Sequence, residues 1–487
     1  MENINLNENN KKTSFTLTKK HYIMFGLFFS LFFTLILIMP IAGDDYWWHT
    51  KVGEWIVKNK EIPTTGIFSW YAKENNLDWF AHEWLCEVFL YGLSILFGDN
   101  GGVVYLFITI ILIGSLLYIF NYKDYLKNLT FSSFWIFIGF FAIASISTAR
   151  PHMLTISMLA LLIYICEKIK KDENYKLYFL YSIISIIWAN YHGGSSNLTY
   201  IIPIIYFITN SFNFKYERIQ SIKVKKSYRY LILAIINTLA LFLNPRTYEL
   251  LFYPYSYTAD YDKYIAEWMS PSIANGGFAI FLIILICLIL FTTKIEIQFS
   301  DLALIGCFML LTLQSIRFNA WLYIVATMLI FKYIREIKDK SIYKYLCYEF
   351  CILGIAFLTY SIYSFHNGTT YIEKYISEEV IDILKTENYE NLMNYYDYGS
   401  YLIYEDIEVF IDGRADMYVD SNFIKSAEAT RYTYDYTPEE FIKEFKFDMF
   451  ILPKENYLSF YLEQNEDKYK KIYTDDILSI FKEISNN

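Results

Sequence analysis

The stretch that decides the fold is GDDYWWHTKVGEWIVKNKEIPTTGIFSWYAKENNLDWFAHEWLCE, residues 43–87. It directly follows the first long apolar run, and two carboxylates, Asp44 and Asp45, stand where that run ends. A helix-period pattern comes next, and its apolar face carries Trp48, Val52, Trp55 and Ile56. Because the opposite face is charged, the pattern predicts an amphipathic helix that lies in a membrane interface.

The same stretch concentrates aromatic side chains. It holds most of the chain's ten tryptophans, namely Trp47, Trp48, Trp55, Trp70, Trp79 and Trp84. Indole prefers the headgroup level of a bilayer, where one edge of the ring is apolar and the other is wet, so we expect these rings at the membrane surface. The two carboxylates, together with His49, His82 and Glu83, would then form a set of titratable groups at the membrane boundary.

The composition places the whole chain in the membrane class. Hydrophobic residues make up 55% of the 487 residues and charged residues only 19%, which is too apolar for one soluble core. The six cysteines show no zinc-binding spacing, so we interpret them as core filler. The polar and basic residues 1–21 predict a cytoplasmic tail, and the first apolar run predicts a retained signal anchor.

Apolar runs predict a polytopic α-helical membrane domain over residues 22–366, with about eleven spans. These lie near residues 22–42, 103–121, 131–148, 153–167, 177–190, 199–213, 230–243, 277–292, 300–315, 318–331 and 345–365. Residues 84–98 are short for a crossing and carry Glu87. If they do not cross, more than half of the 42 basic residues fall in loops on the N-terminal side, which the positive-inside rule makes cytoplasmic. The first loop, residues 43–102, is then external.

This topology gathers the unusual polar side chains on the outer side. Besides the first loop, the outer loops and span ends hold Arg150, His152, Asn190, His192, Asn244, Arg246, Glu267, Arg317 and Asn319. The predicted cytoplasmic loops are merely basic by comparison. We therefore expect one outward-facing polar cavity that is built from many helix ends.

The chain changes character after residue 366. Residues 367–487 are acidic overall, and they alternate the helical patterns SEEVIDILK and TPEEFIKEF with the strand-like runs YLIY, EVFID and FDMFILP. The last piece, YKKIYTDDILSIFK, predicts a hairpin, so we expect a small extracytoplasmic α/β domain. In FIDGRADMY, the residues Asp412, Arg414 and Asp416 indicate a turn ion pair more strongly than a site. The sequence shows no Gly-rich phosphate loop, repeat or nucleic-acid-binding patch.

The order of these features resembles a known superfamily. One span is followed by an external loop that opens with carboxylates, an amphipathic helix (WWHTKVGEWI), a turn at Pro63, an aromatic return (DWFAHEWL) and an apolar helix ending in FG. This arrangement is similar to the start of the GT-C glycosyltransferases, which include protein mannosyltransferases, aminoarabinose transferases and oligosaccharyltransferases. The motifs DYWWH, HEWL, NYHGG, NPR, YDYGSYLIY and FIDGRADMY resemble more closely a group of bacterial multi-span proteins that are grouped with these enzymes.

The resemblance implies a transferase that moves a sugar from a polyprenyl-phosphate carrier to a glycan, lipid or protein acceptor at the outer membrane face. Asp45 is then the first choice as general base or acceptor-orienting group, ahead of Asp44 and Glu83. The phosphate would be held by Arg150, Arg246 and Arg317, because a guanidinium matches phosphate oxygens in a bidentate manner. Further substrate contacts, proton donors or metal ligands would be His49, His82, His152 and His192. The sequence requires no cofactor, although a divalent metal would be compatible with it, and no nucleic-acid partner is expected.

Structural interpretations stand beside these assignments. The carboxylates can be the hydrated end of a span, a lone arginine can be a snorkelling anchor, His82 with Glu83 can be a structural pair, and His192 can cap a helix. Two other classes of protein are alternatives, a transporter of lipid-linked glycans and a non-catalytic scaffold. The predicted spans carry almost no ionisable residues in their centres, which argues against transport, and a scaffold does not need polar groups gathered on one side.

Overall fold

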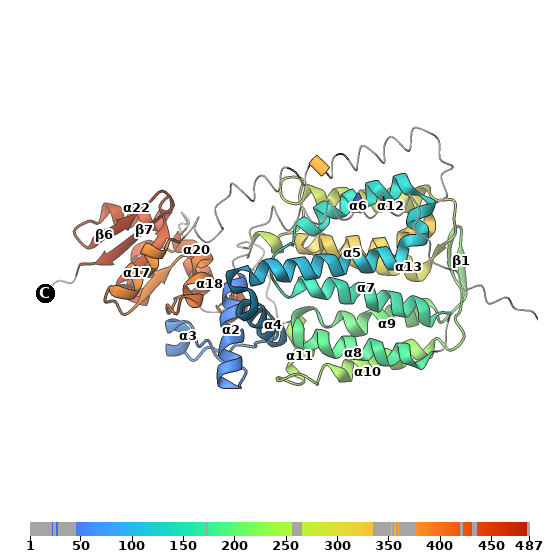
Figure 1. The fold of residues 1–487 in the computed structure, drawn as a ribbon, viewed down its shortest axis with the longest axis horizontal. Coiled ribbons are helices and arrows are strands. Elements are labelled where there is room, and N and C mark those ends of the chain that lie inside the picture. The colour runs from blue at the N-terminus through green and yellow to red at the C-terminus, as the bar shows by residue number, and fades with distance from the viewer. Residues whose placement is uncertain are drawn as a thin grey trace, which may run out of the picture.

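The fold consists of a helical bundle with a small α/β domain at one end. The structure is a computed structural model, and it describes residues 45–171, 174–255, 265–334, 376–418, 422–430 and 436–484, with a few isolated positions elsewhere. Helices α2 (Asp45–Asn59) and α4 (Trp84–Phe97) of the first loop lie where the bundle and the α/β domain meet, and α3 (Trp70–Glu74) lies on the side of α2 away from the bundle (Figure 1). The predicted spans 22–42 and 345–365 fall, apart from those isolated positions, outside the described residues.

Each of the other predicted spans coincides with a described helix. In chain order these are α5 (Gly101–Lys127), α6 (Leu129–Ala144), α7 (His152–Ile169), α8 (Tyr175–Tyr191), α9 (Leu198–Thr209), α10 (Tyr228–Ala240), α12 (Gly277–Thr292), α13 (Phe299–Gln314) and α14 (Asn319–Ile330). By length and composition, two described segments can cross a membrane, Trp84–Asn121 and His152–Ile169. Four shorter apolar helices accompany them, α6, α10, α12 and α13.

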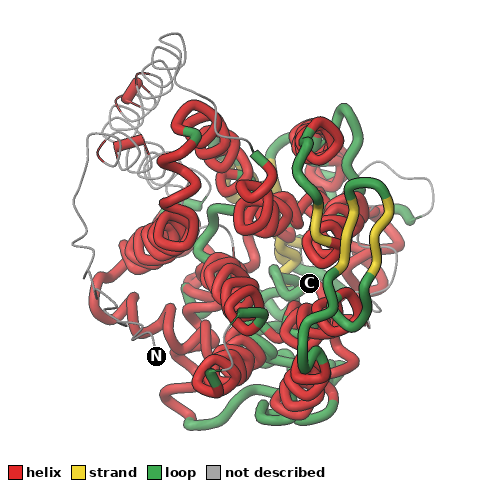
Figure 2. The backbone as a smooth tube through the Cα atoms, turned by 90° about the vertical axis from the view of Figure 1, so that its right-hand side faces the viewer, coloured by secondary structure: helices red, strands yellow, loops and turns green. Residues whose placement is uncertain are grey.

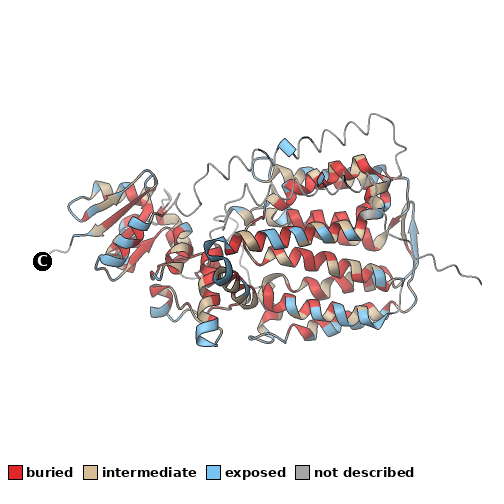
Figure 3. Cartoon of the chain, in the orientation of Figure 1, coloured by how far each residue is buried: buried red, intermediate tan, exposed pale blue. Residues whose placement is uncertain are grey.

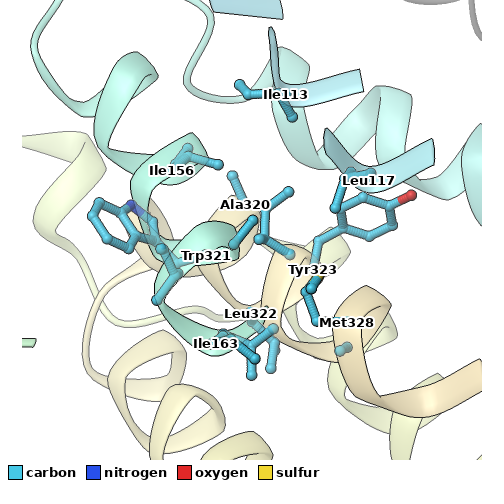
Figure 4. Packing of buried hydrophobic residues seen from close by; sticks show 14 of the residues in the cluster. Ile113, Leu117, Ile156, Ile163, Ala320, Trp321, Leu322, Tyr323 and Met328 are labelled. Carbon is cyan, nitrogen blue, oxygen red and sulfur yellow. The ribbon is translucent and has the colours of Figure 1, made fainter. Parts of the chain in front are cut away.

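Helix α14 lies inside the bundle because it is apolar on every side. All of its residues are buried, and Tyr323 stacks on Trp135 of α6 with 5.5 Å between the ring centroids. The Tyr323 hydroxyl donates a hydrogen bond to the Trp135 carbonyl at 3.0 Å. Gly139 makes room for this ring, since a Cβ there would lie 2.4 Å from Tyr323 Cζ. Figure 4 shows the surrounding core, with Ile113, Leu117, Ile156, Ile163 and Met328.

The outer surface of the bundle is partly apolar and exposed (Figure 3). Helix α10 exposes Leu231, Ile232, Ile235, Ile236 and Leu239. Helices that contact lipid tails present such a surface. At the end away from the α/β domain, the strands β1 (Phe214–Tyr216), β2 (Ile219–Ser221) and β3 (Ile297–Gln298) form a small sheet that we did not predict (Figure 2).

Helices α2 and α4 pack closely against each other. Gly53 of α2 comes so near to α4 that a Cβ on it would lie 2.0 Å from the Glu87 carbonyl oxygen. Helix α2 confirms the helix predicted at the start of the first loop, whereas its position in a membrane interface stays a prediction. After α4 the chain turns at Gly98, whose φ is 58°, and α5 begins three residues later. The absence of a crossing at residues 84–98 stays a prediction.

The α/β domain contains a four-stranded mixed sheet. Its order is β4 (Leu392–Asn394), β5 (Met449–Pro453), β7 (Leu478–Glu483) and β6 (Tyr469–Thr474), with β4 parallel to β5 and the other pairs antiparallel. The helices of the domain are α17 (Glu378–Thr386), α18 (Tyr396–Tyr404), α19 (Ala415–Tyr418), α20 (Ile424–Thr430), α21 (Pro438–Phe445) and α22 (Tyr457–Gln464). The predicted hairpin, the strand in FDMFILP and the helices in SEEVIDILK and TPEEFIKEF are confirmed.

Two predicted strands of this domain are wrong. The run YLIY lies in α18, because a short apolar run has no periodicity that separates a buried strand from a buried helix. The run EVFID joins no strand of the sheet, since its backbone pairs with the first loop at Ser69 and with the Asn394 side chain instead. Asn394 Oδ1 accepts from the Phe410 N–H at 2.8 Å, and its Nδ2 donates to the Ile411 carbonyl at 2.7 Å.

The first loop completes the core of the α/β domain. Ser69 Oγ donates to the Phe410 carbonyl at 3.1 Å, and Trp70 Nε1 donates to the Leu392 carbonyl at 3.0 Å. The buried indoles of the loop are Trp47, Trp48, Trp70 and Trp79. These four rings are covered by protein, whose interior offers them both apolar contacts and hydrogen-bond acceptors, whereas Trp55 and Trp84 are half-buried. That the six rings lie at the depth of the headgroups stays a prediction.

Candidate functional site

Asp45 occupies the first turn of α2, where both oxygens of its carboxylate are engaged. Oδ1 accepts a hydrogen bond from Trp48 Nε1 at 2.9 Å, and Oδ2 lies 2.5 Å from Arg150 Nη2. The Arg150 guanidinium also pairs with Glu267 of η5 (Ala266–Trp268), with 2.9 Å between Nη1 and Oε2. The positive end of a helix dipole favours an anion in the first turn. Asp45 is thus held in one orientation.

Burial and charge act in opposite directions on these carboxyl groups. Burial raises the pKa of Asp45 above its usual value, and the Arg150 guanidinium opposes that rise. Burial also acts to raise the pKa of Glu267, but Arg150 and Arg317 outweigh it and lower that pKa to about 2. Arg150 therefore lies between two carboxyl groups, which carry more negative charge than it carries positive charge when both are ionised.

Glu83, which directly precedes α4, is surrounded by imidazoles. Its carboxyl oxygens lie 3.5 Å from His49 Nε2, 3.7 Å from His82 Nδ1 and 3.5 Å from His192 Nε2. Burial raises the pKa of Glu83 to about 8, and it lowers the pKa of His82 to about 3 and that of His49 well below its usual value. At neutral pH the cluster is therefore a protonated carboxyl group among neutral imidazoles.

The other predicted histidines lie at one end of α7 and at one end of α8. His152 Nε2 lies 2.7 Å from a backbone carbonyl oxygen of the preceding turn. His192 follows α8, and its Nδ1 lies 2.8 Å from Ser195 Oγ, so its Nε2 is left to face the carboxyl group described above. Gly193 is required by packing, because a Cβ there would lie 2.9 Å from His82 Cβ. The HEWL and NYHGG motifs thus meet in space.

The three predicted arginines have different surroundings. Arg150 is held between two carboxylates. Arg246 pairs with the exposed Asp78 of the first loop, with 2.7 Å between Nη2 and Oδ1. Arg317 in η6 (Ile316–Phe318) stacks on the Trp268 ring at 4.4 Å and forms no ion pair with any residue that the structure describes. The structure therefore brings Arg150 and Arg317 to one cluster and holds Arg246 against the first loop.

The α/β domain reaches this cluster with the segment DGRAD, residues 412–416. Asp412 and Arg414 form a buried bidentate pair in which Nε and Nη2 each donate at 2.7 Å, so the ion-pair interpretation of this segment is confirmed. Gly413 between them contacts the site directly. A Cβ on Gly413 would lie 2.2 Å from Asp45 Oδ1 and 2.8 Å from Trp48 Nε1.

Tyr253 was missed by sequence reasoning, as was the pairing of Glu267 with Arg150. Tyr253 in η3 (Tyr253–Tyr255) donates to Asp416 Oδ2 at 2.9 Å, and its ring lies 4.5 Å from that of His82. The only sequence signal for Glu267 was its place in an outer loop. No signal marked Tyr253, because one tyrosine among 47 does not stand out.

Two expectations from the sequence remain, a catalytic role for Asp44 and compatibility with a divalent metal. Asp44 lies outside the described residues, so its role stays a prediction. Across the described ranges, no group of three or more His, Cys, Asp or Glu side chains has a geometry that could hold a metal ion. The compatibility of the sequence with a divalent metal stays a prediction, and no chemical step is assigned to a metal.

Comparison with known proteins finds relatives of the fold. No family model and no curated protein matches the sequence. The archaeal oligosaccharyltransferase AglB from Archaeoglobus fulgidus, in complex with an inhibitory peptide and a dolichol-phosphate, matches with a TM-score of 0.57 at 11% identity, over 90% of this chain and 70% of that chain. The apo form of the A. fulgidus oligosaccharyltransferase matches over the same shares with a TM-score of 0.53 at 11% identity. ArnT from Cupriavidus metallidurans, bound to undecaprenyl phosphate, matches with a TM-score of 0.51 at 9% identity, over 96% and 99% of the two chains.

These likenesses concern the fold, and they extend over nearly the whole chain. They agree with the resemblance found in the first-loop motifs, which rests on the sequence alone. The chain therefore shares the overall fold of these oligosaccharyltransferase and ArnT structures, in agreement with its resemblance to GT-C enzymes.

Proposed function

We propose that this protein is a membrane glycosyltransferase that moves a sugar from a polyprenyl-phosphate-linked donor to an acceptor hydroxyl of a glycan, lipid or protein. The reaction would take place at the outer face of the plasma membrane, with the N-terminus in the cytoplasm and residues 367–487 outside. The observation that carries the proposal is the oriented carboxylate of Asp45, 2.5 Å from Arg150. It lies in a fold shared with AglB bound to dolichol-phosphate and ArnT bound to undecaprenyl phosphate.

In this reaction the acceptor oxygen attacks the anomeric carbon of the sugar. The bond between that carbon and the phosphate oxygen breaks, and the polyprenyl phosphate leaves with the electron pair. The acceptor proton goes to a base, for which we assign Asp45. Arg150 and Trp48 fix the orientation of this carboxylate, and its raised pKa makes it a stronger base than an exposed aspartate.

Arg317 is the best placed of the arginines to hold the phosphate. Arg150 and Arg246 are already paired with carboxylates, whereas Arg317 forms no ion pair within the described residues. Its stacking on Trp268 orients the guanidinium plane and leaves the N–H edge available. A guanidinium binds two phosphate oxygens at once and stabilises the charge on the leaving group.

Glu83 takes a different role because of its protonation state. With a pKa of about 8, it is mostly protonated at neutral pH, so it donates a hydrogen bond and is a poor base there. We assign it to a contact with the acceptor or with the leaving phosphate. His49, His82 and His192, which are neutral, hold its position.

Binding of undecaprenyl phosphate to the purified protein in nanodiscs, followed by native mass spectrometry, tests the phosphate site. We expect the parent to bind and Arg317→Gln to weaken binding by ~10- to 100-fold, since a hydrogen bond to a charged group contributes ~1.5–3 kcal/mol. Arg246→Gln is the matched control and should change binding little. A parent protein that does not bind this lipid contradicts the proposal.

Mass spectrometry of surface glycans in a deletion strain tests the reaction. We expect one glycan modification to be lost, and to be restored by the parent gene but not by Asp45→Asn. A scaffold predicts that Asp45→Asn restores the modification as well as the parent does. A transporter predicts that the lipid-linked sugar accumulates on the cytoplasmic face.

A further inference from the structure

Gly413 of the α/β domain and Asp45 of the first loop are in direct contact. A Cβ on Gly413 would lie 2.2 Å from Asp45 Oδ1, 2.8 Å from Trp48 Nε1 and 3.1 Å from Ser400 Oγ. Real Cβ atoms essentially never come closer than 3.0 Å to another heavy atom. The space that a side chain would need at position 413 is therefore filled by the Asp45 carboxylate and by the indole that hydrogen-bonds to it.

The segment that carries Gly413 is fixed by its neighbours. The Arg414 N–H donates to Asp412 Oδ1 at 3.0 Å, the Arg414 guanidinium donates twice to the same carboxylate, and the Tyr418 hydroxyl donates to its Oδ2. The Arg414 guanidinium also lies 4.6 Å from the ring of Trp79 in the first loop. These interactions fix the turn, which holds Gly413 against Asp45.

We propose that Gly413 is a positioning residue for sugar transfer, because it closes over Oδ1 of Asp45 and holds the carboxylate in the orientation set by Arg150 and Trp48. The terminal torsion of an aspartate has a broad energy profile, so an ion pair alone restrains it weakly. The backbone of Gly413 removes that freedom. The α/β domain is then part of the active site, and the base is correctly placed only when this domain is docked.

This inference rests on the proposed function for its catalytic meaning. Gly413→Ala should reduce the glycan restored to the deletion strain by ~10²-fold, the cost of misplacing a reacting group by ~1 Å. Its binding of undecaprenyl phosphate should stay within about twofold of the parent's, because Arg317 is untouched. Simple misfolding would instead lower protein level and lipid binding together.

Gly66→Ala is the matched control for this variant. A Cβ on Gly66 would lie 2.4 Å from Ala72 Cβ and 2.6 Å from Met417 Sδ, so it strains the same contact between the first loop and α19 without reaching Asp45. We expect it to keep transfer. Transfer at the parent rate by Gly413→Ala, or an equal loss in Gly66→Ala, would overturn the proposal.

A stability measurement separates this inference from the proposed function. Gly413→Ala should lower the melting temperature of the parent, and lower it less in an Asp45→Ala background, where the 2.2 Å clash with the carboxylate is gone and the 2.8 Å approach to Trp48 Nε1 remains. If the effects of Gly413→Ala and Asp45→Ala on the melting temperature simply add in this double-mutant cycle, the positioning contact is overturned, whatever reaction the protein catalyses. Conversely, a parent that binds no undecaprenyl phosphate removes the proposed function while a non-additive cycle keeps the contact.

Discussion

Asp45→Asn separates the chemistry of the site from its structure. Asparagine keeps the size of the side chain and an oxygen that accepts from Trp48 Nε1. Asp45 Oδ2, which lies 2.5 Å from Arg150 Nη2, is replaced by the uncharged amide nitrogen of asparagine. This nitrogen is a donor and cannot accept a hydrogen bond from the guanidinium. The substitution therefore removes a base and one of the two carboxylates that flank Arg150.

The expected loss of transfer is ~10²–10⁴-fold, the usual contribution of general acid–base catalysis. This corresponds to about 3–5 kcal/mol in the activation free energy, at ~1.36 kcal/mol for each factor of ten. The loss of stability should be smaller than the ~3–5 kcal/mol that breaking a fully buried ion pair costs. The Asp45 and Arg150 side chains are 13% and 28% exposed, and Glu267 remains beside the guanidinium.

The assay is the amount of glycan restored to the deletion strain per unit of membrane-inserted protein, measured over a range of pH. The parent should lose activity as the pH falls through the raised pKa of Asp45, because a base must be deprotonated, and the asparagine variant should lack this dependence. Asp78→Asn is the control, since that first-loop side chain is 73% exposed and pairs with Arg246 outside the cluster. If Asp45→Asn is expressed normally and transfers at the parent rate, the role passes to Asp44, to Glu83 or to no carboxylate.

Other perturbations probe the protonation, packing and topology of the protein. Because the pKa of Glu83 rises to about 8 on folding, the free energy of unfolding should fall as the pH rises from about 5 to 8, and thermal melts of Glu83→Gln should show a flatter dependence. Gly53→Ala should lower the melting temperature and protein level, since the Glu87 carbonyl is backbone and cannot move aside, whereas Gly92→Ala in α4, with nothing within 4 Å, should be neutral. A cysteine at Asn76 should react with an impermeant reagent from outside, and one at Lys225 only after permeabilisation; external labelling at Lys225 would reverse the predicted topology.

Local patterns in the sequence predicted much of the fold. Helix α2, the bundle helices and the β6–β7 hairpin each follow from a periodicity within one segment. The wrong predictions concern segments whose structure depends on residues far away in the sequence. EVFID joins no strand of the sheet because the first loop and the Asn394 side chain satisfy its backbone. Trp70 of the first loop is buried because residues more than 300 positions later cover it.

The candidate site was predictable as a set of residue types on one side of the membrane, but not as a set of pairs. The positive-inside rule predicts the same side of the membrane for Arg150, Arg246 and Arg317, and it does not distinguish among them. Only the packing of η5 and η6 brings a carboxylate and an indole beside two of them and leaves Arg246 against the first loop. Gly413 was invisible for a related reason, since a glycine in a turn has many explanations until its neighbour in space is known.

The contact between Ser69 and Phe410 spans 341 residues of chain, which has a consequence for biosynthesis. At ~5–20 residues per second, the first loop emerges from the ribosome roughly 20–70 s before the segment that will cover its tryptophans. During that interval Trp70 and its neighbours must rest on lipid or on a chaperone. A chain that ends after the bundle would never bury them, so we expect proteolytic quality control to remove such a truncated protein before any defect in its chemistry can be observed.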